Sequence, residues 1–193
     1  TVERFEQDDH AVLAHFSDGT SDTFDLLVGA DGQGSRIRTG ILPPDAGDPY
    51  LRMGIHMASW FIPRTPADDG NLRNTYLAPG GRMILRRSHN WTETQVYFVL
   101  RESSEEGSGI HRAPLDQQKR FWIGRFQDAG WQIDRVIRGM MATPVFYSQE
   151  VVQVRTSTWY KGRVVLVGDA AHCASPFSGM GVSGSLVGAY VLA

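Results

Sequence analysis

The chain has 193 residues, of which 41% are hydrophobic and 21% charged, so it can bury a core and is too apolar for a disordered segment. Its formal net charge of −2 comes from interleaved acidic and basic residues, which gives no electrostatic reason to expect a nucleic acid or a membrane surface as partner and leaves small molecules. The single cysteine, Cys173, excludes an internal disulfide and a cysteine-based metal cluster and favours the cytoplasm, and we expect no metal.

The N-terminal part is predicted to be three strands followed by a helix. Alternating apolar and polar residues indicate strands over residues 2–7, 11–16 and 23–28, joined by short polar turns as in an antiparallel meander. The third strand runs into Gly29, Ala30, Asp31 and Gly32, which is how a buried strand enters a tight turn towards a ligand. A short helix over residues 35–41 should follow, capped by Ser35.

The middle of the chain is predicted to be a second, β-rich domain. Residues 43–49 are rich in Pro, Asp and Gly and indicate a linker. Beyond it we expect strands over residues 52–62, 74–77, 82–87 and 94–101, helices over 115–129 and 133–140, and a β-rich run over 143–159. Residues 164–167 then form a short apolar run of the kind that is buried on both faces of a sheet.

Residues 170–193 contain no Asp, Glu, Lys or Arg and are long enough to suggest a membrane span. Pro176 and four glycines make the segment too irregular and too polar for hydrocarbon, so we expect no membrane span.

Two motifs carry the functional prediction. The first occupies residues 25–38 and reads DLLVGADGQGSRIR; a strand delivers Asp31 at its carboxyl end, and glycines let a ligand approach the backbone. The second occupies residues 162–172 and reads GRVVLVGDAAH, followed by Pro176, Gly179 and Gly181. They resemble the DG and GD fingerprints of class A flavoprotein monooxygenases, the para-hydroxybenzoate hydroxylase type. Their order around a β-rich middle segment agrees with that family.

This resemblance implies an α/β fold: a partial FAD-binding domain of the Rossmann-like, glutathione-reductase type with an inserted mixed β-sheet substrate domain. The expected domains are residues 1–42 and 159–193 for FAD and residues 50–158 for the substrate. In this family the aspartate of the GD motif accepts hydrogen bonds from the ribityl chain of FAD, and the next helix directs backbone N–H groups at the flavin pyrimidine. The cofactor-binding residues expected by resemblance are Asp31, Gly32, Arg38, Gly168, Asp169, Ala170, Pro176, Gly179, Met180, Gly181 and Val182.

The family chemistry implies a reaction as well. NADPH or NADH reduces FAD, the reduced flavin captures O2 as a C4a-hydroperoxide, and an aromatic or polyketide-like small molecule is hydroxylated. The sequence singles out no catalytic residue. A glycine-rich N-terminal strand–helix unit that binds the pyrophosphate of FAD is not found in this chain, so we expect a further segment or a complementary chain to complete the site.

Two alternatives stay open. The same scaffold could serve a flavin-dependent halogenase or a reductase, because a fold does not fix a reaction. A protein of another class, a non-catalytic fragment or remnant that cannot hold FAD alone, is also compatible with the sequence. His172 is expected to brace the loop through hydrogen bonds. Gly179 to Gly184 satisfy the pattern G-x-G-x-x-G, but the match is a weak sign of a dinucleotide site because it does not follow directly on a strand.

Overall fold

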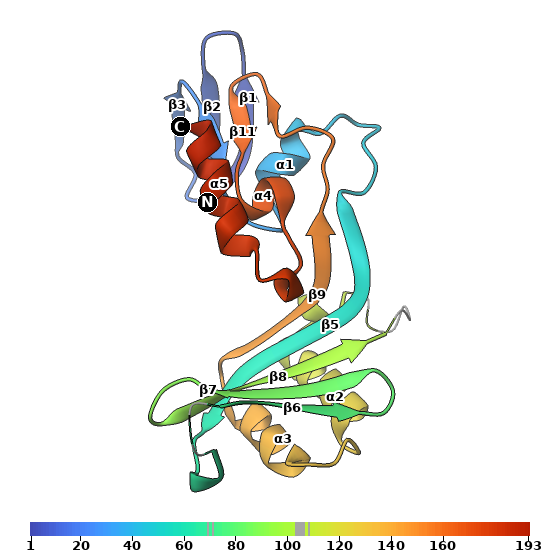
Figure 1. The fold of residues 1–193 in the computed structure, drawn as a ribbon. Coiled ribbons are helices and arrows are strands. Elements are labelled where there is room, and N and C mark those ends of the chain that lie inside the picture. Colours follow the sequence, from blue (N-terminus) through green and yellow to red (C-terminus); the bar gives the residue numbers. More distant parts are fainter. Residues whose placement is uncertain (69, 71, 103–106, 108) are drawn as a thin grey trace. The chain divides into compact units, whose positions relative to one another are not determined.

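A computed structural model describes residues 1–68, 70, 72–102, 107 and 109–193. The chain divides into two compact units, of which unit 1 comprises Thr1–Met53 with Val152–Ala193 and unit 2 comprises Gly54–Val151. Each unit has its own buried apolar cluster. The fold is α/β, with three separate sheets in the described residues (Figure 1).

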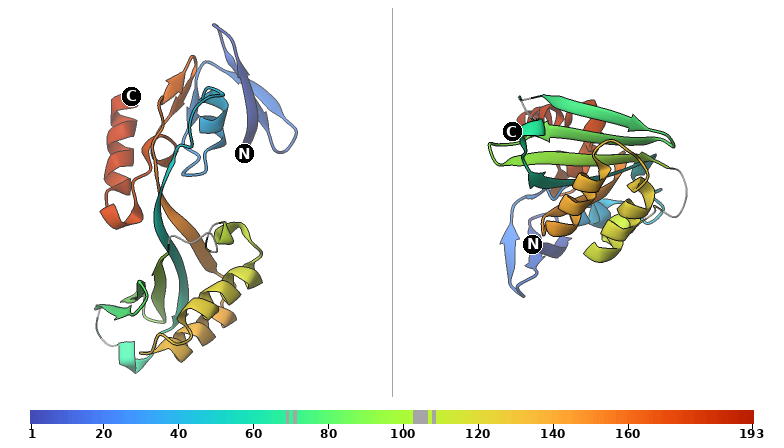
Figure 2. Two further views of the ribbon diagram at one scale, coloured as in Figure 1. Left: turned by 90° about the vertical axis from the view of Figure 1, so that its right-hand side faces the viewer. Right: turned by 90° about the horizontal axis from the view of Figure 1, so that it is seen from below.

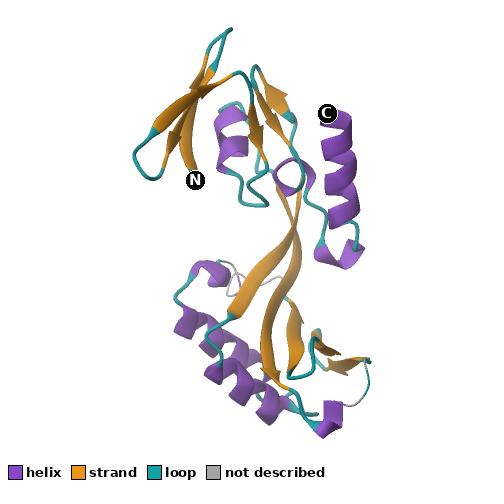
Figure 3. Ribbon diagram, turned by 90° about the vertical axis from the view of Figure 1, so that its left-hand side faces the viewer, coloured by secondary structure: helices purple, strands orange, loops and turns teal. Residues whose placement is uncertain are grey.

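Unit 1 opens with the predicted antiparallel meander, formed by β1 (Val2–Gln7), β2 (Val12–Phe16) and β3 (Ser21–Phe24). The single strand predicted over residues 23–28 is wrong, because the chain breaks after Phe24 and resumes as β4 (Leu27–Gly29) in a different sheet. Figure 3 shows the meander and the second sheet as separate groups of strands. The apolar pattern runs through the break, so it could not indicate that the two halves pair with different partners.

The second sheet of unit 1 has the order β10 (Tyr160–Lys161), β11 (Val164–Leu166) and β4. Strands β4 and β11 run parallel, with Leu166 opposite Gly29. The helix α1 (Arg36–Ile41) follows β4, and its residues Ile37 and Ile41 share the buried cluster with Val164 and Leu166. This packing fixes the helix that follows the first motif against the strand of the second.

The chain of unit 1 ends in α4 (Asp169–His172), a 3-10 turn η4 (Pro176–Ser178) and α5 (Gly181–Leu192). Helix α5 is apolar but has no buried residue, and its large side chains are exposed, for example Leu186 at 67% and Tyr190 at 84%. None of the helices in the described part of the chain is both long and apolar enough to cross a bilayer.

Unit 2 is built on a five-stranded sheet with the order β6-β7-β8-β5-β9, in which β6–β7, β7–β8 and β8–β5 pair antiparallel. The strands of this sheet are β5 (Tyr50–Pro63), β6 (Arg73–Ala78), β7 (Arg82–Ser88), β8 (Glu93–Arg101) and β9 (Phe146–Val154), of which the start of β5 and the end of β9 belong to unit 1. The 3-10 turns are η1 (Pro66–Asp68) and η3 (Ile110–Arg112). The predicted strands are therefore confirmed with small shifts at their ends, although the run over residues 143–159 is a strand only in its central part.

The helices α2 (Leu115–Phe126) and α3 (Ile133–Ala142) lie on one face of this sheet (Figure 2). They bury an aromatic core in which the rings of Phe98 and Phe126 stack with centroids 3.9 Å apart and Trp60 meets Phe98 edge-on. Every second residue of β5 from Ala58 to Ile62 is buried against the helices. The opposite face of the sheet carries the alternate side chains.

Candidate functional site

The two sequence motifs meet at the carboxyl ends of neighbouring parallel strands. Strand β4 leads into Asp31 and strand β11 into Asp169, and Val165 lies opposite Val28 in the pairing register. The N–H of Val167 donates to the carbonyl of Gly29 at 3.0 Å, which extends the ladder to the start of both loops. Ligands of α/β sheets bind at the carboxyl ends of the strands, so this edge is the candidate site.

The loop after β4 is closed by Asp31. Its carboxylate accepts hydrogen bonds from the hydroxyl of Ser35 and from the backbone N–H groups of Arg36 at 2.8 Å and Ile37 at 3.3 Å. The hydroxyl of Ser35 in turn accepts from the N–H of Arg38 at 2.9 Å, which confirms Ser35 as the cap of α1. Gly32 has φ +84°, a backbone conformation that favours glycine. The Asp31 carboxylate therefore shapes the loop by capping α1.

Arg38 connects the two motifs from the inside. Its side chain is buried, with 1% exposed, and its guanidinium donates to the carbonyl oxygens of Ala170 at 2.9 Å and Gln33 at 2.6 Å and to the hydroxyl of Tyr50 at 2.8 Å. The guanidinium also lies 5.1 Å from the centroid of the Tyr50 ring. Arg38 thus holds the first loop and α4 together with donors that are already bound to protein acceptors.

The loop after β11 turns at Gly168, whose φ of +61° again requires glycine-like freedom. Asp169 begins α4 and is exposed. Burial raises the pKa of the neighbouring Cys173 thiol, and the negative charge of Asp169 raises it further, to about 11. The thiol is therefore protonated and unreactive at neutral pH, and the carboxylate of Asp169 is accessible for a ligand.

The segment between α4 and α5 ends in a helix N-terminus. The hydroxyl of Ser175 accepts from the N–H of Phe177 at 3.3 Å, and Gly179 takes φ +65° before α5 begins at Gly181. Among the described residues, no hydrogen bond is recorded for the N–H groups of Gly181 and Val182. Such free donors and the positive end of the helix dipole favour an electron-rich ligand atom.

The side chain of His172 contacts its neighbours through ring packing, while its backbone N–H donates to the carbonyl of Gly168 at 2.9 Å. Its ring centroid lies 5.2 Å from that of Trp159, and a Cβ added to Gly188 would lie 3.0 Å from its Nε2. No side-chain hydrogen bond of His172 is recorded within the described chain, so the predicted bracing by hydrogen bonds is replaced by ring packing. Gly184 and Gly188 of α5 have no side chain and so leave space for the imidazole of His172.

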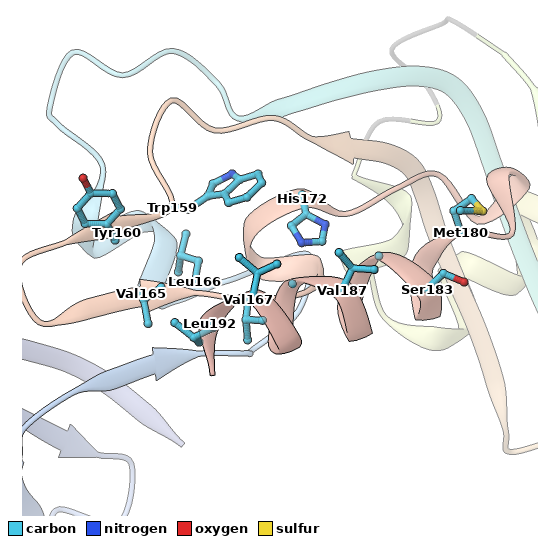
Figure 4. A pocket seen from close by; sticks show the side chains of 13 residues that line it. Trp159, Tyr160, Val165, Leu166, Val167, His172, Met180, Ser183, Val187 and Leu192 are labelled. Carbon is cyan, nitrogen blue, oxygen red and sulfur yellow. The ribbon is translucent and has the colours of Figure 1, made fainter.

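A cavity of about 520 Å³ lies between α5 and the second sheet of unit 1 (Figure 4). It is lined almost entirely by apolar side chains, with Trp159 and His172 on one side and Val187 and Val191 of α5 on the other. An open apolar cavity beside a helix that buries none of its residues indicates a surface that binds a further apolar group.

The predicted residues gather in unit 1, in the two loops and at the start of α5, and their binding of a cofactor stays a prediction. The sequence did not identify two residues whose side chains contact the site residues. Tyr50 lies in a segment that looked like the start of another domain, and Trp159 lies in a run that looked like one long strand. Neither position carries a motif, so only the three-dimensional contacts identify them.

The sequence profile of the FAD binding domain family matches residues 1–193. An FAD-dependent monooxygenase of Sarocladium schorii, asL6, is 38% identical over 98% of this chain and 45% of its own length. A second monooxygenase of the same organism, asL4, is 33% identical over the whole chain and 45% of its own length. The chain thus spans about half the length of these relatives.

Solved structures of flavoproteins also resemble this chain. The tetracycline destructase Tet(51) superposes with a TM-score of 0.83 at 32% identity, covering 98% of this chain and 50% of that one. HpxO of Klebsiella pneumoniae in complex with FAD shares the fold, with a TM-score of 0.70 at 22% identity over 96% of this chain and 47% of that one. The chain belongs to the FAD binding domain family of flavoprotein monooxygenases.

Proposed function

We propose that the full-length protein is an FAD-dependent monooxygenase that uses NADPH or NADH and O2 to hydroxylate an aromatic or polyketide-like small molecule. The observation that carries the proposal is the pair of parallel strands β4 and β11, which bring Asp31 and Asp169 to one edge of the sheet. In the family, this edge holds FAD. Unit 2, with its large antiparallel sheet, is proposed to bind the substrate.

The residues present fit FAD. Asp169 offers an exposed carboxylate beside Gly168, whose positive φ and missing side chain let the loop pack closely against Ser185 of α5. The start of α5 offers N–H donors at Gly181 and Val182. A ribityl chain presents hydroxyl donors, and a flavin pyrimidine presents carbonyl acceptors, so the two parts of the site match the two parts of the cofactor.

Each expected residue then has a proposed role. Asp169 accepts hydrogen bonds from ribityl hydroxyls, with Gly168 and Ala170 allowing close contact. Gly181 and Val182 present backbone N–H donors to the pyrimidine, and the turn that positions them is formed by Pro176, Gly179 and Met180. Asp31 and Gly32 shape the first loop, and Arg38 positions both loops through its three acceptors. When bound, FAD supplies the electron transfer and oxygen activation.

The rest of the protein is proposed to complete unit 1. In the described residues, β4 has a neighbouring strand on only one side, and Val28 is 43% exposed although parallel strands are normally covered on both faces. A helix that is apolar all round, like α5, is normally buried. We propose that a further segment adds a strand beside β4 and covers the cavity next to α5, and that this segment binds the pyrophosphate of FAD.

The test is to express the full-length protein and the 193-residue chain separately. We expect the full-length protein to copurify with FAD and to oxidise NADPH or NADH faster with substrate than without. A hydroxylated product distinguishes a monooxygenase from a halogenase or a reductase. The 193-residue chain is expected to bind FAD weakly or not at all, as followed by flavin fluorescence. A full-length protein without flavin would contradict the proposal.

A further inference from the structure

Figure 2 shows α2 and α3 on one face of the unit 2 sheet. The opposite face combines apolar residues at its centre with two arginines at one end. Its side chains alternate with the buried ones along each strand. Leu85 and Met83 of β7 lie there beside Tyr97 and Val99 of β8, all paired across the strands and partly or nearly buried. Leu77 on β6 is 74% exposed on the same face.

At one end of this face two arginines lie directly opposite each other. Arg73 of β6 and Arg87 of β7 are register partners, and both are exposed. Like charges in directly opposite positions destabilise a sheet. Within the described residues no acidic side chain forms an ion pair with either guanidinium. The pair therefore places two positive charges side by side at the end of an apolar surface, where the nearest carboxylate on the same face of β8 is Glu93, two residues from Gln95.

The guanidinium of Arg87 is held in place by protein groups. Its Nε and Nη2 donate to Oε1 of Gln95 at 2.9 and 2.7 Å, and its Cζ lies 5.5 Å from the centroid of the Tyr97 ring. Both Gln95 and Tyr97 come from the neighbouring strand β8. These contacts leave Nη1 of Arg87 available and reduce the entropy that a ligand must overcome to engage it.

We propose that the Arg73–Arg87 pair binds an anionic oxygen of the substrate, a carboxylate or an ionised phenol or enol, while the apolar ring system lies on Leu85 and Tyr97. The inference rests on the proposed function, because it assigns a substrate class to unit 2. The charge of the pair selects the anion, and the adjoining apolar side chains select a planar body over a simple inorganic anion.

The experiment compares two probes of equal size, 2-naphthoate and 2-naphthamide, which differ in charge. Binding to the 193-residue chain is measured by ligand-observed NMR at low and at high salt. We expect 2-naphthoate to bind about tenfold more tightly than 2-naphthamide at low salt, and the difference to shrink at high salt because charges at an exposed site are screened. Equal affinities for both probes would overturn the inference.

Variants identify the site. Arg87→Gln and Arg73→Gln should each remove most of the preference for 2-naphthoate. Neither should lower the melting temperature, because both side chains are exposed and the change removes a repulsion between like charges. Arg101→Gln is the control, since Arg101 is an exposed arginine at the other end of β8 on the same face. Equal losses in Arg101→Gln and Arg87→Gln, or displacement of 2-naphthoate by an equal concentration of acetate, would contradict the proposal.

The binding of 2-naphthoate and 2-naphthamide to the 193-residue chain is measured without FAD, so it tests this inference separately from the proposed function. A chain that prefers 2-naphthoate while the full-length protein lacks FAD would contradict the proposed function alone. A full-length protein that holds FAD and oxidises NADPH or NADH, without a preference that depends on Arg87, would contradict this inference alone.

Discussion

Arg38 on α1 donates a hydrogen bond of 2.9 Å from Nη1 to the carbonyl oxygen of Ala170, 132 residues later in the chain. The bond joins the loop that follows β4 to the helix that follows β11. Because the guanidinium also binds Gln33 and Tyr50, one side chain joins the first loop and the start of β5 to α4, which lies far away in the sequence.

Replacing this arginine should therefore destabilise unit 1. We expect Arg38→Ala to lower the free energy of unfolding by about 3 kcal/mol, because the hydrogen bonds of a buried guanidinium to three acceptors are lost. Arg38→Lys should not restore stability, since one ammonium cannot reach the three acceptors that the planar guanidinium spans. Urea unfolding measures both variants. Arg36→Ala, at an exposed position of the same helix, should stay within about 0.5 kcal/mol of the parent, and an equal loss there would contradict the role of Arg38.

The first motif also contains two glycines, Gly29 and Gly34, that differ in the space around them, so a substitution of one is a control for the other. A Cβ on Gly29 would lie 2.8 Å from Cγ2 of Ile37 and 2.9 Å from Cδ2 of Leu166, whereas nothing lies within 4 Å of a Cβ on Gly34. We expect Gly29→Ala to cost about 1–3 kcal/mol of stability through overpacking and Gly34→Ala to be neutral or slightly stabilising. Thermal unfolding of the two variants measures this difference in stability. Equal melting temperatures would show that the α1–β11 contact is looser than the structure indicates.

The sequence predicted most elements, because periodic patterns and caps are local. Ser35, for example, was identified as a helix cap from its neighbours alone. The break between Phe24 and Leu27 was not predicted, because β4 pairs with β11 from the far end of the chain, and local hydrophobicity carries no information on the partner. The likeness of the two motifs to known fingerprints located the candidate loops. The sequence could not show that Arg38 is already engaged by protein acceptors, since burial and partners arise only in the fold.

In unit 2 a buried carboxylate sets acid stability. Burial would raise the pKa of Asp68, but hydrogen bonds from Arg135 and from the N–H of Thr65, with the charges of Arg135 and Arg86, outweigh burial and hold it well below its ordinary value of 3.8. Since the folded pKa lies below the unfolded one, Asp68 contributes stability above about pH 4, and this contribution is lost as the pH falls further.

Asp68→Asn should cost about 3–5 kcal/mol at pH 7, because it removes the buried carboxylate that pairs with the guanidinium groups of Arg86 and Arg135. It should also flatten the loss of stability at acidic pH. Asp116→Asn is the control, since that carboxylate pairs with Arg120 on the exposed surface of α2 and its loss should change little. The measurement is urea unfolding from pH 7 to pH 3. A parent-like pH profile in Asp68→Asn would contradict the assignment.

A buried histidine should add a second pH dependence. His56 is 3% exposed, and its Nδ1 has no hydrogen-bond partner in the described part of the chain. Burial lowers the pKa of His56, and the nearby carboxylates of Glu150 and Glu102 only partly oppose this effect. The unfolded state therefore binds the proton first, and stability is lost as the pH falls below about 6.5 towards the folded pKa.

His56→Gln should remove that component, so the fall in unfolding free energy between pH 7.5 and pH 5 should be smaller than in the parent. His10→Gln removes an exposed histidine and should leave the pH profile unchanged. If the two variants show the same profile as the parent, His56 does not contribute to the pH dependence.

Asp169 provides the most direct test of the proposed flavin site. Its carboxylate is exposed at the end of β11, so an alanine there removes a ligand acceptor without opening a cavity in the core. In the full-length protein we expect Asp169→Ala to weaken FAD binding ten- to a hundredfold, because hydrogen bonds to a charged group contribute roughly 1.5–3 kcal/mol each. Asp31→Ala should act differently: the Asp31 carboxylate caps α1, so its loss should lower stability as well as FAD affinity. FAD titration followed by fluorescence, together with unfolding of the flavin-free protein, separates the two effects. An Asp169→Ala protein that retains parental FAD affinity would show that the carboxylate does not contact the cofactor.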